Sequence, residues 1–470
     1  MDPDIYCHDA VNILSRKSWI ISVQEETQVK GRFLNGNEAD VTLYLNHTGL
    51  MWENAGAFNA LLVFAEHRYF GKSIPFGRNV LDHMEFLSTQ QALADYAVLL
   101  EKLKRELAVD VPVIGFGGSY GGMLGTWFRL KYPHLIDGMI AGSAPVVSFL
   151  GDSEHPIDTE GFNRIVTFDM SKEAGAAPNC IQNLRHALKV VMEMTTTAAG
   201  RHQVAKLLGL CDQKSLTSAK DIIDLASNAY SYLAMGNYPY PTSYIMNGMV
   251  ELPAYPMRAA CDPFAPTFAR NDTIGLLQAF RDSIGVYYNA TKNETCLLSS
   301  PPAARGNESD ASENAHEAQR DAMVNFWDYL ECSELYMPMS TDGVHDVFPA
   351  SPVNESRDDA TCFEQWGVHL KPQWAYVEFG GMKALREASN IVFSNGNFDP
   401  WSALGVLDSL SSSVVAVSIP EGAHHLDLFF THPLDPPAVT QARRTEIAYV
   451  RQWVDDFYAK KRKNVKIAIQ

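Results

Sequence analysis

The chain contains 470 residues, of which 46% are hydrophobic and 20% are charged, and its formal net charge at pH 7 is −17. This length and hydrophobic content are sufficient for more than one buried core. The acidic balance argues against nucleic acid and anionic membranes as partners, because both would repel the protein.

Residues 36–150 show the pattern of an α/β sheet, in which short apolar runs alternate with helical segments. Residues 61–65 form an apolar run typical of a buried strand. Ser88 and Gln91 have the spacing of a capping box, in which each side chain bonds to a free backbone amide at a helix start. The helix that follows is expected to bury one face, formed by Leu93, Ala97, Leu100, Leu103 and Leu107.

The most informative motif lies between a predicted strand at 111–116 and a predicted helix that ends at Tyr132-Pro133. It reads Gly117-Gly118-Ser119-Tyr120-Gly121. In a strand-to-helix turn of this kind, small neighbours let the backbone close and expose the serine oxygen at the edge of the sheet. Backbone N–H groups at the helix start can then stabilise an oxyanion. Glycine-flanked serines also occur in structural turns, but this context favours a nucleophile.

After residue 150 the chain becomes mostly helical, and strand patterns return at 390–394 and 413–418. A final amphipathic helix is predicted at 438–458. The economical interpretation is an α/β core interrupted by a helical insertion. It divides the chain into an atypical N-terminal segment (1–35), a first core part (36–150), a helical cap (151–383) and a second core part (384–470).

Seven cysteines are present, and none forms a C-x-x-C pair, so the sequence indicates neither a metal site nor a cofactor. Six of them lie between Cys180 and Cys362, and Cys180–Cys211 is the favoured local pair among the open connectivities. N-x-S/T sequons accompany them and favour a glycosylated, oxidising environment; they are Asn46, Asn271, Asn289, Asn293, Asn307 and Asn354.

A serine nucleophile needs a base within hydrogen-bond reach and an acid that orients the base. Asp399 follows the predicted strand at 390–394, and His424 follows the one at 413–418. The order Ser, Asp, His is that of α/β-hydrolases, and both residues would lie at the C-terminal ends of strands. Asp399 would also suit a turn. One histidine of the pair would suit a packing role, which we assign to His425.

Four motifs together resemble the post-proline serine peptidases, the family of lysosomal Pro-X carboxypeptidase and dipeptidyl peptidase II. They are Gly117–Met123, Glu66–Ser73, Asp399-Pro400-Trp401 and Gly422–Leu428. The resemblance extends from about residue 36 to the C-terminal helix. It implies an α/β-hydrolase core with a helical cap, glycosylation, and cleavage beside proline at acidic to neutral pH.

The resemblance also implies roles for individual residues. Ser119, Asp399 and His424 match the catalytic triad. The backbone N–H of Tyr120 matches one oxyanion donor, and the turn Gly36-Asn37-Glu38 resembles the one that supplies the other donor, assigned to Asn37. Met123 and Trp401 match residues expected to line an apolar pocket for the proline ring.

Within the family, the chain resembles dipeptidyl peptidase II more closely, for example at Asn395-Gly396-Asn397 and at residues 233–242. Asp346 then matches the carboxylate that anchors the substrate's free amine, although a solvated loop carboxylate is the simpler reading. The expected function is therefore release of N-terminal dipeptides that end in proline or alanine. A Pro-X carboxypeptidase and a non-catalytic binding protein of the same fold remain alternatives.

The N-terminal region departs from the family pattern. Only 35 residues precede Gly36, and residues 31–34 form a poor, short strand in front of the oxyanion turn; residues 18–23 are another strand candidate. The first residues also lack a signal-peptide pattern, so either the protein is not secreted or the true start of the gene is missing. The resemblance implies a lysosome, another vesicle or secretion as the location. It implies peptide substrates, no nucleic acid and no membrane as partners, and leaves a homodimer open.

Overall fold

The computed structural model describes residues 30–34, 38–297 and 325–469, with the side chains of 30–34 and 465–469 excepted. A six-stranded sheet with the order β2-β1-β3-β4-β5-β6 forms its centre, and all neighbouring strands are parallel. The strands are β1 (Lys30–Leu34), β2 (Ala60–Phe64), β3 (Val113–Gly118), β4 (Gly138–Gly142), β5 (Ile391–Gly396) and β6 (Val414–Ile419). A parallel sheet needs helices on both faces, because its strands are apolar on both sides.

Successive residues of the central strands alternate between two hydrophobic clusters, as the two-residue period of a strand requires. In β4, Met139 and Ala141 join one cluster and Ile140 joins the other. In β5, Phe393 lies on the first face and Val392 on the second. The sheet therefore lies between two helical layers, as predicted for an α/β-hydrolase core.

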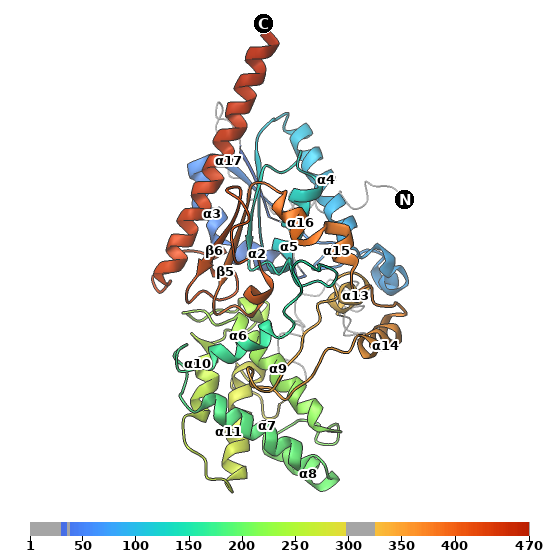
Figure 1. Cartoon of the computed structure of the whole chain (residues 1–470), viewed down its shortest axis with the longest axis vertical. Helices are drawn as coiled ribbons and strands as arrows, with labels where there is room; N and C mark the ends of the chain where they lie inside the picture. Colours follow the sequence, from blue (N-terminus) through green and yellow to red (C-terminus); the bar gives the residue numbers. More distant parts are fainter. Residues whose placement is uncertain (1–29, 35–37, 298–324, 470) are drawn as a thin grey trace.

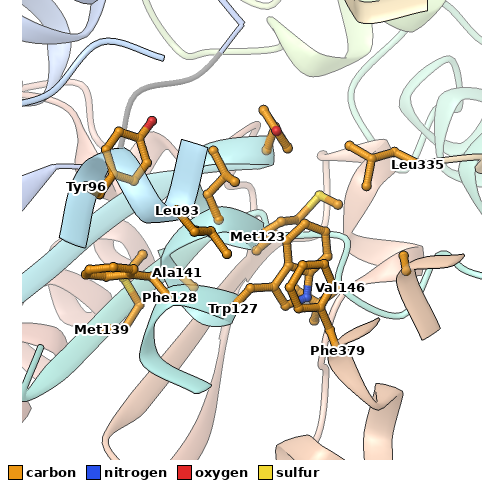
Figure 2. Packing of buried hydrophobic residues seen from close by; sticks show 14 of the residues in the cluster. Leu93, Tyr96, Met123, Trp127, Phe128, Met139, Ala141, Val146, Leu335 and Phe379 are labelled. Atoms are coloured by element: carbon orange, nitrogen blue, oxygen red, sulfur yellow. The ribbon is translucent and has the colours of Figure 1, made fainter. Parts of the chain in front are cut away.

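One layer packs α4 and α5 on the sheet with helices from later in the chain, as Figure 1 shows. Its helices are α4 (Thr89–Glu106), α5 (Ser119–Lys131), α13 (Phe326–Ser333), α15 (Trp374–Phe379) and α16 (Gly381–Arg386). Trp127 of α5 stacks on Phe379 of α15 with ring centroids 4.0 Å apart (Figure 2). This stack fixes the chain that leads into β5 against the helix that follows β3.

The opposite layer contains α2 (Val41–His47), α3 (Gly49–Ala55) and α17 (Pro437–Ile469). Trp453 of α17 packs against β4, where a Cβ on Gly138 would lie 2.1 Å from its ring. The C-terminal half of α17 projects beyond the body of the molecule (Figure 1). The predicted helix at 438–458 is thus confirmed and is longer than the apolar pattern indicated. Among the residues that the structure describes, no helix combines the length and apolarity needed to cross a membrane.

The inserted helices surround a separate hydrophobic cluster at the lower end of Figure 1. They are α6 (Gly161–Asp169), α7 (Cys180–Met194), α8 (Ala198–Leu208), α9 (Ala219–Met235), α10 (Pro256–Cys261) and α11 (Thr273–Tyr288). Another helix, α14 (Glu355–Trp366), lies beside α13. Short 3-10 helices complete the structure: η1 (Gly56–Phe58), η2 (Gly77–Phe86), η3 (Tyr244–Met246), η4 (Asp262–Phe264), η6 (Pro400–Leu404) and η7 (Leu426–Leu428).

The disulfides of the insertion correct one prediction. Cys180 pairs with Cys261 and Cys211 pairs with Cys296, so the expected Cys180–Cys211 bond is wrong. Proximity in sequence was a poor guide, because α10, which ends at Cys261, packs on α11, and α11, which precedes Cys296, packs on both α7 and α8. A third disulfide, Cys332–Cys362, joins α13 to α14.

Two local predictions also need correction. Residues 31–34, predicted as a poor strand, belong to β1, which pairs with β2 on one side and β3 on the other. Ser88 caps α4 as predicted, but Gln91 does not reach back to the cap; its side chain donates to the Glu85 carbonyl and accepts from Arg68. The strand candidate at 18–23 and Cys7 lie outside the described residues.

Truncation of the Trp127–Phe379 stack tests the attachment of α15. Phe379 is only 5% exposed, so we expect Phe379→Ala to lower the free energy of unfolding by about 3–5 kcal/mol. Thermal unfolding at one scan rate would report this as a lower Tm. Phe363→Ala is the matched control, because Phe363 is 53% exposed. Equal Tm values for the two variants would contradict this account of the core.

Candidate active site

Ser119 occupies a strained turn between β3 and α5. Its φ is +55°, in the left-handed region that residues with a Cβ rarely adopt. The turn closes only because its neighbours are small: a Cβ on Gly117 would lie 2.3 Å from the Gly121 carbonyl oxygen. A Cβ on Gly118 would lie 2.5 Å from the His425 ring. The backbone thus holds a half-buried serine at the C-terminal end of a central strand.

The chain reverses its direction along the sheet beside this turn. From β1 it moves outward to β2 and then crosses to β3 on the other side of β1. Such a switch point leaves a crevice at the C-terminal ends of the two strands, where ligands of open α/β sheets bind. The predicted oxyanion residue Asn37 follows β1 but lies outside the described residues.

Asp399 and His424 meet on the loops that follow β5 and β6. The Asp399 Oδ1 atom lies 2.9 Å from His424 Nδ1, and both side chains are buried. Asp399 also caps η6 by accepting a hydrogen bond from the Trp401 N–H at 3.1 Å. A carboxylate beside Nδ1 keeps the proton on that nitrogen, which leaves Nε2 free to act as a base.

The end of α9, within the insertion, holds the backbone of His424 in place. The His424 N–H donates to the Met235 carbonyl at 3.2 Å, and the Tyr238 hydroxyl donates to the His424 carbonyl at 3.0 Å. The Trp401 indole N–H contacts the Met235 sulfur at 3.0 Å. Residues from the insertion therefore help to set the position of the histidine ring.

His425 has different surroundings from His424. Its φ is +39°, its backbone N–H donates to Ser143 Oγ at 2.7 Å, and its Nε2 lies 3.2 Å from the Tyr244 hydroxyl. Burial lowers the pKa of this ring well below its ordinary value, so it is neutral. These contacts are those of a packed residue that supports the turn at Gly118.

Tyr120 is buried directly behind Ser119. The His67 Nδ1–H must donate to the Arg68 carbonyl at 2.6 Å, so His67 Nε2 accepts from the Tyr120 hydroxyl at 3.1 Å. Burial lowers the pKa of His67 to about 4, which keeps this tautomer neutral. The bond anchors the first turn of α5, and it is the backbone N–H of Tyr120 that is expected to face an oxyanion.

A cavity of about 320 Å³ opens above Ser119 and His424. Two walls enclose it, and a different hydrophobic cluster supports each of them. The first wall belongs to the cluster around α5 and is almost entirely apolar or aromatic; its residues are Tyr120, Met123, Trp327, Met337 and Trp401. Met123 and Trp401 were predicted here. Trp327 and Met337 were missed, because no sequence spacing links them to the motifs.

The second wall belongs to the cluster that supports α2 and α3, together with the end of α9. It carries several polar groups, from Glu38, Tyr44, Tyr232, Tyr244 and Asn247. Glu38 was noticed in the sequence only as part of the oxyanion turn. Among the described residues that line the cavity, none is lysine or arginine.

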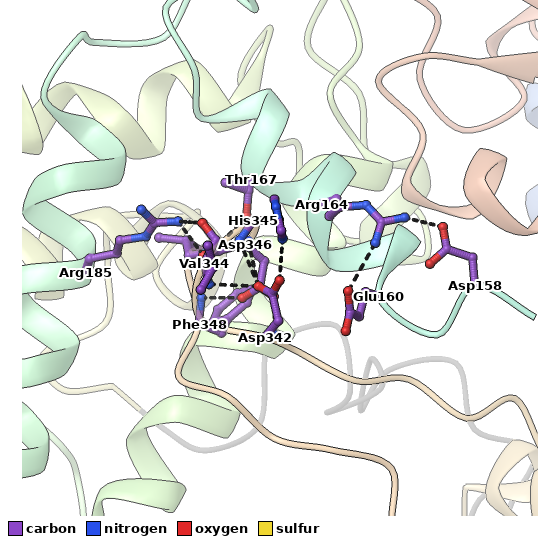
Figure 3. Close-up of polar contacts among 11 residues, drawn as sticks. Asp158, Glu160, Arg164, Thr167, Arg185, Asp342, Val344, His345, Asp346 and Phe348 are labelled. Atoms are coloured by element: carbon purple, nitrogen blue, oxygen red, sulfur yellow. Dashed lines mark hydrogen bonds and ion pairs between the residues drawn. The ribbon is translucent and has the colours of Figure 1, made fainter.

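Asp346, the expected amine anchor, is not among the residues that line this cavity. It lies in a loop of the insertion, beside Asp342 and Phe348 (Figure 3). Its side chain is fully buried, and its two oxygens accept hydrogen bonds from the Asp342 and Phe348 N–H groups at 2.7 and 2.8 Å. Arg185 of α7 donates to its backbone carbonyl at 2.6 Å. In this arrangement Asp346 organises its own loop.

The chain matches the family model "Serine carboxypeptidase S28" over residues 19–446. It is 38% identical over 435 residues to a lysosomal Pro-X carboxypeptidase from Pongo abelii, with 91% of this chain and 81% of the relative covered. It is 37% identical to a protein of the same name from Homo sapiens, with the same coverage. A haloalkane dehalogenase loop variant from Bradyrhizobium elkanii is a similar solved structure, at 10% identity and a TM-score of 0.33 over 94% of both chains.

Covalent labelling tests the predicted roles of Ser119 and Asp399 independently of any substrate. A fluorophosphonate is expected to modify Ser119 and to leave Ser119→Ala unlabelled. Asp399→Asn should slow labelling by about 10³–10⁴-fold, because the wrong histidine tautomer would then be favoured. Asp408→Asn, at an exposed loop position, is the control and should label at the normal rate. Equal labelling rates for Asp399→Asn and the control would remove Asp399 from the site.

Proposed function

The chain belongs to the serine carboxypeptidase S28 family, and from this premise we propose that it removes the C-terminal residue of peptides whose penultimate residue is proline. The observation that carries the proposal is the cavity in which Ser119 and His424 lie beside a wall of aromatic and thioether side chains. The names of the curated relatives support the same specificity.

In the proposed reaction, Ser119 Oγ attacks the carbonyl carbon of the proline residue while His424 Nε2 takes the hydroxyl proton. Asp399 stabilises the positive charge that forms on the ring. The negative charge on the substrate oxygen is stabilised by the Tyr120 N–H and, as the sequence predicts, by Asn37. His424 then protonates the leaving amine, the C–N bond breaks, and water releases the proline carboxylate from Ser119.

The apolar wall suits a proline ring for a simple physical reason. The ring has no N–H and no polar side-chain atom, so it leaves no unpaired donor when water is removed. Met123 and Trp401 would contact it from α5 and η6, and Trp327 and Met337 would close the pocket from α13 and the loop after it. A larger polar side chain would find few partners there.

Release of N-terminal dipeptides is the second candidate function. An aminopeptidase of this kind needs a carboxylate in the cavity to bind the substrate's ammonium group. Asp346 lies outside the cavity, which weighs against this reading, whereas Glu38 lines it and favours it. Binding without cleavage is less well supported, because Ser119 and His424 line one cavity, His424 bonds to Asp399, and β1 is paired on both sides.

We also propose the organisation and location that the sequence suggested. The proposed division has core parts 36–150 and 384–470 and a cap at 151–383. The separate cluster of α6 to α11 supports the cap, whereas α13, α15 and α16 pack in the core layer, and β1 is added to the core. A lysosomal, vesicular or secreted location fits the three disulfides and the names of the relatives. Peptides are the expected partners.

Paired substrates distinguish the two candidate functions. We expect acetyl-Ala-Pro-Phe with a free carboxylate to be cleaved between proline and phenylalanine, because a carboxypeptidase requires the free carboxylate of its substrate and not a free amine. Mass spectrometry of the products would identify the bond. Ala-Pro-aminocoumarin with a free amine is the comparison substrate. Cleavage of that substrate alone would make dipeptide release the better assignment.

Asp346→Asn gives a second, independent comparison. Because its oxygens accept hydrogen bonds from backbone N–H groups of the same loop, we expect a lower Tm and an unchanged KM for either substrate. KM should be measured with Ala-Pro-aminocoumarin, where an amine anchor would have its largest effect. A KM increase of tenfold or more for this substrate, and none for the acetylated peptide, would restore Asp346 as the anchor.

A further inference from the structure

The polar wall of the cavity has an unusual composition for a site that must bind a peptide end. Glu38 is accessible to water within the cavity, and the Tyr232 side chain is 37% exposed. Asn247, at the end of η3, is exposed beside them. The described lining residues thus include a carboxyl, an amide and tyrosine hydroxyls, but neither lysine nor arginine.

A carboxypeptidase has to bind a terminal carboxylate, and among the described lining residues only neutral donors could do so. An ionised Glu38 would repel that carboxylate, whereas a protonated Glu38 would donate a short, charge-assisted hydrogen bond to it. Glu38 opens onto the cavity, but the protein on its other sides partly desolvates it and raises its pKa above the ordinary value, which favours the protonated form. Its own backbone N–H and a charged His424 act in the opposite direction.

Among the described residues, four titratable side chains face Glu38 from the neighbouring elements. They are His424 after β6, Tyr120 of α5, Tyr232 of α9 and Tyr244 of η3. Burial raises the pKa of all three tyrosines, so they stay neutral and can donate hydrogen bonds. Its own backbone N–H and a protonated His424 both favour the charged form of Glu38, and a protonated His424 cannot act as the base.

We propose that Glu38, in its protonated form, together with Tyr232 and Asn247, is the subsite that binds the terminal carboxylate of the residue released from the substrate. This inference rests on the proposed carboxypeptidase function. The residues of this subsite line the same cavity as Ser119, His424 and the apolar wall.

The direction in which KM changes with pH follows from the protonation of Glu38. Glu38 has a raised pKa, so its donor is fully present at low pH and is lost as the pH rises through that value. Above the pKa of Glu38, KM for a substrate with a free carboxylate should therefore rise by up to tenfold per pH unit, because ionised Glu38 then repels the substrate carboxylate. A peptide with a C-terminal amide carries no charge to repel, and its KM should change little.

The experiment compares acetyl-Ala-Pro-Phe with acetyl-Ala-Pro-Phe-amide across a pH series, with KM and kcat fitted separately. In the wild type, KM of the free acid should rise with pH and KM of the amide should stay flat. Glu38→Gln keeps a donor but cannot titrate, so it should make KM of the free acid nearly independent of pH. Glu173→Gln, at an exposed site, is the matched control and should behave as the wild type.

If Glu38→Gln fails to fold, the KM profiles of the wild-type enzyme with the acid and the amide substrate still test the carboxylate subsite. Parallel KM profiles for the acid and the amide would overturn the carboxylate subsite while leaving carboxypeptidase activity intact. A Glu38→Gln enzyme that is labelled by fluorophosphonate but keeps the wild-type KM profile would assign the titration to another group. No cleavage of either acetylated peptide, with rapid cleavage of Ala-Pro-aminocoumarin, would instead contradict the proposed function and make Glu38 the candidate anchor for an amine.

Discussion

The hydrogen bond between His424 Nδ1 and Asp399 Oδ1 is the constraint on which the candidate site depends. It joins two loops that leave adjacent strands, and it is useful only if β5 and β6 keep their register from Ile391–Val414 to Gly396–Ile419. Ser119 is positioned differently, by a turn with a positive φ that can close because Gly117 and Gly118 have no Cβ. The parallel sheet relates the two, because every strand presents its C-terminal end to the same crevice.

The inserted helices supply more than a cover for this crevice. Met235 accepts the backbone hydrogen bond of His424 and contacts the Trp401 indole, and Tyr238 binds the His424 carbonyl. The cavity then has one wall that extends the apolar core beneath α5 and another that carries most of its polar groups. This asymmetry gives a peptide two different surfaces, one for a ring and one for a charged or polar end.

Much of the core could be predicted from sequence, because its strands are apolar and its motifs sit at strand ends. Four strands, the helix after Ser119 and the chain order Ser, Asp, His follow from local patterns. β4 was not predicted, since Gly138-Met139-Ile140-Ala141-Gly142 is short and flanked by glycines that serve close packing against Trp453. The disulfide pairing, Trp327, Met337 and the burial of Asp346 depend on how distant segments meet, which no local pattern records.

The contact between Met235 and His424 has a consequence for how such proteins can change over evolution. Insertions in α/β cores are often regarded as exchangeable modules that change which substrates reach a common catalytic core. Here the insertion contributes a backbone acceptor to the residue that would carry the proton. Replacing the whole insertion would therefore also disturb the position of His424 in the core. Diversification in this lineage is easier through individual substitutions on the two walls of the cavity than through exchange of the helices that bear them.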